Sequence, residues 1–139
     1  MNQPEQPREY PFSDRFDWLL FGVTIAIGVV YTWYIYANNL LLMMVDQYSH
    51  LAIARQVTDS MTPGLSQLGF WPPLLHILMA PATAVDFLYQ TGLAAPITLV
   101  PIMAISVVFM YRLVLLLTGH RLFAILAVAA YLLNPYVLY

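Results

Sequence analysis

Three long apolar stretches divide the chain. Residues 18–38 carry no charge, and because a helix rises about 1.5 Å per residue they would reach across the roughly 30 Å hydrocarbon core of a bilayer. The second stretch, 93–117, contains a single charged residue, Arg112. The third, 122–139, is uncharged and stops with the sequence. The pattern predicts three transmembrane helices over these ranges, the third of them cut short.

A cleaved signal peptide is the competing interpretation of the first stretch. The preceding residues 1–17 contain prolines and acidic as well as basic side chains, and the apolar run is longer than that of a signal peptide. Residues 1–17 are therefore predicted to form a cytoplasmic tail in front of a retained helix.

The connection over 39–92 is too long for a plain loop between two spans and too apolar for disorder. An acidic first turn and a Thr-Pro-Gly stop predict one short helix at about 46–60. A Pro-Pro pair starts a second helix at about 72–90, with a kink at Pro81. Aromatic side chains among the apolar ones suit helices that lie in the membrane interface.

Composition agrees with a membrane protein. Of the 139 residues, 61% are hydrophobic and 9% charged, and the mean hydropathy is +0.73. A net charge of -2 argues against a nucleic-acid partner, and the absence of cysteine excludes disulfides and thiolate metal sites. The predicted fold class is an all-α integral membrane protein, with three transmembrane helices and two interfacial amphipathic helices in the first extracytoplasmic loop.

Arginine placement orients the predicted spans. Arg8 and Arg15 precede the first span, Arg112 lies near the end of the second, and Arg121 ends the short turn at 118–121 before the third. Basic residues favour the cytoplasmic side of a membrane. The N-terminus and this turn are predicted to be cytoplasmic, the long loop is predicted to be extracytoplasmic, and a prokaryotic plasma membrane is the expected location.

Asp46 is the main candidate for chemistry. It is the first charged residue after the first span, at the point where that span must meet the outer surface. One interpretation is a helix cap or a boundary residue. The other is a carboxylate beside the bilayer that acts as a base on a hydroxyl or binds a hard cation. The residue pattern alone leaves both open.

Two further candidates follow Asp46 on the same predicted helix. His50 lies one turn later, where it could relay a proton, bind substrate or a metal, or form an ordinary surface pair; no third metal ligand stands at a known spacing. Arg55 could bind a phosphate of the substrate, although a salt bridge with Asp59 at i+4 is favoured. His76 and His120 are expected to be an interface residue and a turn residue. With no histidine inside a predicted span, a haem or pigment site has no support.

Three stretches of the chain resemble the GT-C class of integral-membrane glycosyltransferases. They are VDQYSHLAIARQV, PGLSQLGFWPPLLHIL and YRLVLLLTGHRLFAILAVAAYLLNP, and they follow the order of the N-terminal part of protein mannosyltransferases and aminoarabinose transferases. The resemblance implies inverting transfer of a sugar from a polyprenyl-phosphate donor to an extracytoplasmic acceptor. It also implies that Asp46 lies at the catalytic centre, as a base or as a contact to acceptor or metal.

The chain departs from this class in two ways. Members often carry two adjacent acids where this chain has Asp46-Gln47, and they share at least seven spans. The resemblance therefore implies the N-terminal segment of a polytopic enzyme, inactive alone, with the bilayer and a polyprenyl-linked sugar as partners. A divalent cation is the one cofactor left open.

The alternative is a non-catalytic transmembrane subunit of a larger membrane complex. Small residues on the first and third spans would allow close helix approach. These are Gly22, Ala26, Gly28, Ala124, Ala127 and Ala130. A small transporter has little support, because Arg112 is the only ionisable residue inside a predicted span.

Overall fold

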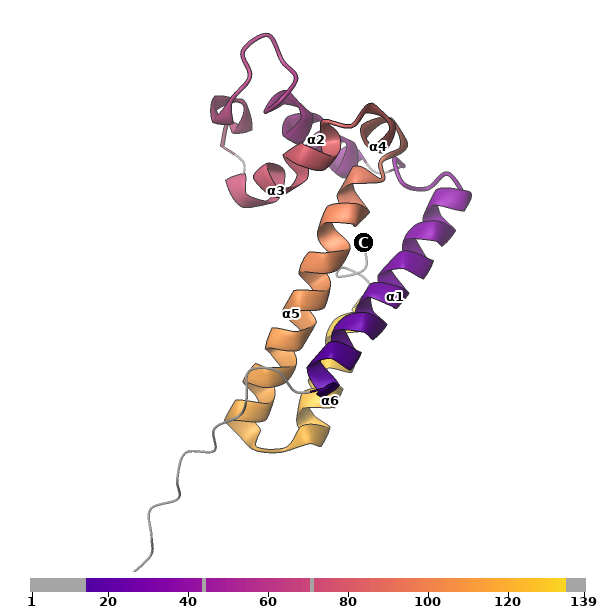
Figure 1. Cartoon of the computed structure of the whole chain (residues 1–139), viewed down its shortest axis with the longest axis vertical. Coiled ribbons are helices and arrows are strands. Elements are labelled where there is room, and N and C mark those ends of the chain that lie inside the picture. The colour runs from indigo at the N-terminus through magenta and orange to yellow at the C-terminus, as the bar shows by residue number, and fades with distance from the viewer. Residues whose placement is uncertain (1–14, 44, 71, 135–139) are drawn as a thin grey trace, which may run out of the picture.

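The computed structural model describes residues 15–43, 45–70 and 72–134 (Figure 1), and the part of the chain that it describes is helical, with no strand. The elements in chain order are α1 (Arg15–Ala37), α2 (Val45–Gln56), the 3-10 helix η1 (Leu65–Leu68), α3 (Pro73–Thr83), α4 (Asp86–Thr91), α5 (Ala94–Thr118) and α6 (Arg121–Leu132).

The described residues form two long helices, a cluster of short helices at one end and α6 at the other. Helices α1 and α5 pack side by side, and α6 folds back along the far end of α5 (Figure 1). The short helices of residues 45–91, which we call the cap, gather at the opposite end, around the start of α5. The start of α1, the end of α5 and the start of α6 therefore share the end remote from the cap.

Helices α1 and α5 are long and apolar enough to cross a membrane. With 23 and 25 residues they extend about 35 and 37 Å. Most of their apolar surface is uncovered: Val30, Trp33 and Leu117 are 66%, 69% and 75% exposed. The core helix of a soluble protein would bury such a surface, so a hydrocarbon environment suits these two helices better.

Boundaries of the first two predicted spans agree with the structure to within a few residues. The span expected at 18–38 begins earlier, at Arg15, so Asp17 belongs to α1 rather than to the tail. The span expected at 93–117 is α5. The helix expected at 46–60 begins at Val45 but already ends at Gln56, because β-branched residues and turn-forming polar residues follow.

A third span is not confirmed. Helix α6 has 12 residues and extends about 18 Å, which is shorter than the hydrocarbon core of a bilayer. Asn134 precedes a proline, a position where helical backbone is disfavoured, and α6 ends two residues before it. Residues 135–139 of the predicted span lie outside the described residues.

The prediction of one helix over 72–90 is wrong. This stretch forms two helices, α3 and α4, which are separated at Ala84 and Val85, and the backbone of Val85 is extended. Pro81 lies inside α3, so the break is not at the proline. Instead, the carbonyl of Thr83, which a continuing helix would use internally, accepts a hydrogen bond from Arg55 Nη1 at 2.6 Å. A tertiary contact therefore ends α3.

Two buried clusters hold the elements together. In the cap, Leu51 and Ala54 of α2 and Met79 of α3 pack with Ala94 at the start of α5. At the other end, α5 and α6 meet through the buried residues Val107, Tyr111, Ala124 and Val128, against Phe16 and Leu20 of α1. The first cluster fixes the cap on α5, and with it the side chains considered next.

Candidate functional site

A chain of polar contacts connects α2 with α3 on the cap. His50 Nε2 lies 3.6 Å from Asp46 Oδ2, one helical turn earlier. His50 Nδ1 lies 2.9 Å from Nε2 of His76 on α3, and His76 Nδ1 lies 3.0 Å from the carbonyl oxygen of Pro72. We call Asp46, His50, His76 and the Pro72 carbonyl the histidine relay.

Exposure falls steeply along the histidine relay. The side chain of Asp46 is 77% exposed and that of His50 is 23% exposed, whereas His76 as a residue is 1% exposed. The relay therefore runs from solvent into the cap. Such an arrangement can accept a proton at its exposed end and hold the accepting ring in a fixed orientation from its buried end.

Of the residues predicted for the site, the structure joins Asp46 and His50 and adds His76. The sequence predicts an interface position for His76, because nothing in it indicates that residues 26 positions apart will meet. Asp46 lies in the first turn of α2, where a carboxylate suits the unpaired backbone amides. Its exposed carboxylate is nevertheless available to a molecule outside the cap.

Arg55 lies in a different environment from the histidine relay. Its Nε and Nη2 donate to Asp59 Oδ2 at 2.9 and 2.6 Å, and Nη2 also donates to Asp86 Oδ1 at 2.6 Å. Hydrogen bonds with Asp59, and then with Asp86, raise the pKa of Arg55. The predicted salt bridge with Asp59 is confirmed. Binding of substrate by Arg55 stays a prediction, and it would have to displace these partners.

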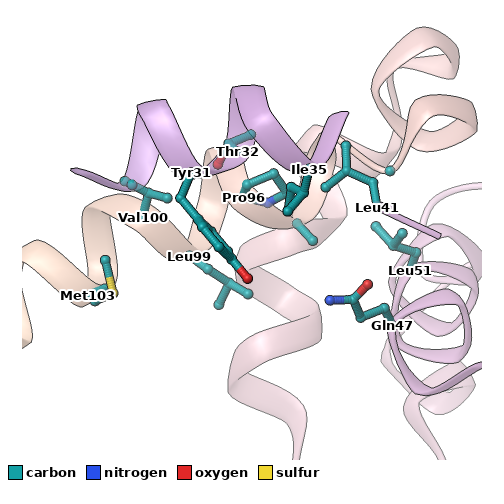
Figure 2. A pocket seen from close by; sticks show the side chains of 13 residues that line it. Tyr31, Thr32, Ile35, Leu41, Gln47, Leu51, Pro96, Leu99, Val100 and Met103 are labelled. Carbon is teal, nitrogen blue, oxygen red and sulfur yellow. The ribbon is translucent and has the colours of Figure 1, made fainter. Parts of the chain in front are cut away.

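An apolar cavity of about 110 Å³ lies beneath the cap, between α1 and α5 (Figure 2). Gln47 and Leu51 close it from α2, and no charged side chain is among the described residues that line it. Figure 2 shows the polar ends of Tyr31 and Gln47 turned toward one another within this cavity. A hydrocarbon chain with a neutral polar group near one end would match this lining.

An open groove of about 420 Å³ lies along the same pair of long helices. Thr32, Pro96 and Val100 line both the groove and the cavity. These three residues therefore form the wall between the groove on the outer surface of α1 and α5 and the cavity under the cap.

The remaining candidates are distant from this site. His120 lies in the exposed turn before α6, where its ring contacts Phe123 at a centroid distance of 5.7 Å. Within residues 15–43, 45–70 and 72–134, no group of three or more His, Cys, Asp or Glu side chains could hold a metal ion. No family model, curated protein or solved structure matches the chain.

Proposed function

We propose that this chain is the N-terminal membrane segment of an inverting glycosyltransferase, which moves a sugar from a polyprenyl-phosphate donor to a hydroxyl outside the membrane. The observation that carries the proposal is the position of Asp46. Its exposed carboxylate stands at the solvent end of the histidine relay, and the next residue, Gln47, lines the apolar cavity. The proposed catalytic carboxylate and the proposed lipid-binding cavity would thus lie next to each other.

The proposed membrane arrangement follows from the two ends of the long helices. Arg15, Arg112 and Arg121 belong to the end remote from the cap, which the positive-inside tendency assigns to the cytoplasm. The cap then lies on the extracytoplasmic surface. Leu74 and Leu78 of α3 are 69% and 45% exposed, so this helix presents an apolar face that suits the membrane interface.

The proposed chemistry uses Asp46 as the hydrogen-bond acceptor for the attacking hydroxyl. The hydroxyl oxygen forms a bond with the anomeric carbon while the bond from that carbon to the phosphate oxygen breaks, so the configuration inverts. Polyprenyl phosphate leaves with the electron pair of the broken bond. Arg55 and Arg112 are each held by carboxylates, so the proposal assigns phosphate binding to residues beyond this segment or to a divalent cation.

The apolar cavity supports the lipid part of the proposal. It lies beside Gln47 at the membrane end of the cap and shares three lining residues with the groove on α1 and α5. An isoprenoid tail that enters from the bilayer would exchange one apolar environment for another, so its transfer into the apolar lining would cost little. The monophosphate head of the lipid would then lie near Asp46.

Substitution of Asp46 tests this function. Asp46→Asn in the full-length protein should lower sugar transfer from a polyprenyl-phosphate sugar in vesicles by roughly 100-fold or more, since it removes the acceptor for the hydroxyl proton. Asp59→Asn is the matched control, because it makes the same change in charge on an exposed carboxylate away from the histidine relay. Normal transfer by a membrane-inserted Asp46→Asn variant would contradict the proposal.

The second candidate is a non-catalytic subunit of a membrane complex. Gly22 and Ala26 are exposed one turn apart on α1, and no atom lies within 4 Å of a Cβ built at Gly22. Another helix could approach closely there. A native protein of about 15.8 kDa that copurifies in fixed ratio with partners, and loses them on Gly22→Ile, would favour the subunit over the enzyme.

A further inference from the structure

Hydrogen bonding in the histidine relay determines which ring nitrogens carry protons. The Pro72 carbonyl can only accept, so His76 Nδ1 must be the donor of their 3.0 Å contact. In neutral His76 the other nitrogen, Nε2, then has a lone pair and accepts. His50 Nδ1 is therefore the donor of the 2.9 Å contact between the rings.

The lone pair of neutral His50 is consequently left on Nε2. This atom faces Asp46 Oδ2 at 3.6 Å, at the partly exposed edge of the relay. The arrangement thus makes Nε2 the nitrogen of neutral His50 that can accept a proton, and it places that nitrogen next to the Asp46 carboxylate.

We propose that His50 Nε2 is the final acceptor of the proton released at this site, and that His76 is the positioning residue that locks His50 in the required tautomer. The proposal rests on the proposed sugar transfer for the source of the proton, which is the acceptor hydroxyl. The hydroxyl O–H bond breaks as its oxygen attacks the sugar, the proton passes to His50 Nε2 directly or through Asp46, and water later removes it.

Burial decides where the positive charge resides. A proton added at His50 Nε2 could drive the proton on Nδ1 across to His76, but His76 is 1% exposed and charging it would be costly. Asp46 faces His50 from α2 and His76 faces it from α3. The nearest charged group further along α2 is Arg55, which is paired with Asp59 and Asp86. The charge therefore stays on His50 beside Asp46.

The buried position of His76 is itself informative. An imidazole that is almost fully buried is costly unless both of its nitrogens have partners, and an apolar residue would fill the same space without that requirement. Both nitrogens of His76 are engaged, one by backbone and one by His50. The backbone carbonyl thus holds the His76 ring in place, and the His76 ring in turn orients the ring of His50.

Nitrogen NMR tests the tautomers without depending on activity. In the full chain labelled with ¹⁵N-histidine, the neutral rings of His50 and His76 should both carry the proton on Nδ1. His120, exposed in its turn, is the internal reference for an unconstrained ring. His76→Leu should release His50 toward the tautomer of His120, whereas His76→Gln, which can both donate and accept, should keep the lock. A proton on Nε2 of neutral His50 would overturn the proposal.

Kinetics test the role of the pair in transfer. His50→Gln should lower kcat by roughly 100- to 10,000-fold, the range for loss of a general base. His76→Leu should lower kcat at unchanged KM and alter the pH profile, and His76→Gln should restore most of both. Equal transfer by wild type and His50→Gln would exclude the proton-accepting role. If the wild type transfers no lipid-linked sugar, the proposed function fails, while the NMR result still decides the tautomer lock.

Discussion

The Arg112 guanidinium donates to the carboxylate of Asp17, a residue 95 positions earlier in the chain. Their side chains are 21% and 10% exposed, and next to them the rings of Phe16 and Tyr111 pack at a centroid distance of 5.0 Å. The pair joins the first turn of α1 to the far end of α5. It therefore fixes the register of the two long helices at the end opposite the cap.

Breaking this pair should destabilise the protein strongly. Asp17→Asn leaves the Arg112 charge largely buried without its carboxylate, which typically costs about 3–5 kcal/mol. Thermal unfolding in detergent should show a lowered Tm. Exchanging the two residues, Asp17→Arg with Arg112→Asp, should recover part of the loss, and an exchange that recovers nothing would show that the pairing itself contributes little.

Close packing between α1 and α5 predicts that a larger residue at Gly28 destabilises the protein. A Cβ at Gly28 would lie 2.5 Å from Val100 Cγ1, and valine is too stiff at χ1 to move aside cheaply. Gly28→Ala should therefore cost about 1–3 kcal/mol of stability. Adding Val100→Ala should relieve the clash. Gly22→Ala is the control, since its Cβ would meet no atom within 4 Å, and it should not destabilise; a loss as large as that at Gly28 would rule out the clash as the cause.

Much of the helical framework could be predicted from the sequence. Uninterrupted apolar runs predict α1 and α5 to within three residues, and Gly92, a residue type typical of helix ends, caps α4 in the left-handed conformation. These features depend on local physics: backbone groups in apolar surroundings must be satisfied within the helix, and glycine adopts positive φ at little cost.

Features set by tertiary contacts could not be predicted. The end of α3 depends on Arg55 reaching the Thr83 carbonyl, 28 residues away, and the histidine relay depends on α2 and α3 meeting at His50 and His76. Sequence patterns place residues on a helix face but do not say which face of another helix lies opposite. Asp46 could be chosen because its signal is local, a charge at the end of an apolar run.

Arg55 is expected to hold the end of α3 and the start of α4 in place. Arg55→Lys keeps the charge but provides one compact ammonium in place of donors to Asp59, Asp86 and the Thr83 carbonyl. Amide hydrogen exchange at 83–91 should become several-fold faster. Arg121→Lys, at the far end of the molecule, should leave exchange there unchanged. Wild-type exchange rates in Arg55→Lys would mean that packing alone holds the junction.

The environment of Tyr89 predicts a loss of protein stability at alkaline pH. Burial, and next the hydrogen bond with Tyr48, raise the pKa of Tyr89, whose ring also lies 5.3 Å below the Arg55 guanidinium carbon. A raised pKa means that the folded protein holds the phenol proton more tightly than the unfolded chain does. Its stabilising contribution is therefore complete below the unfolded pKa of about 10 and is lost as the pH rises through the folded value.

Two substitutions separate these contributions. Tyr89→Phe should remove this part of the alkaline loss in denaturant unfolding measured between pH 8 and pH 11, whereas Tyr34→Phe, at an exposed position on α1, should not. Tyr48→Phe should lower the pKa of Tyr89 in a ¹³C NMR titration of the tyrosine ring carbons but leave it above its ordinary value, because burial remains the larger cause. An unchanged titration would mean that the Tyr48 hydroxyl does not bond to Tyr89 in solution, and that burial alone holds the proton.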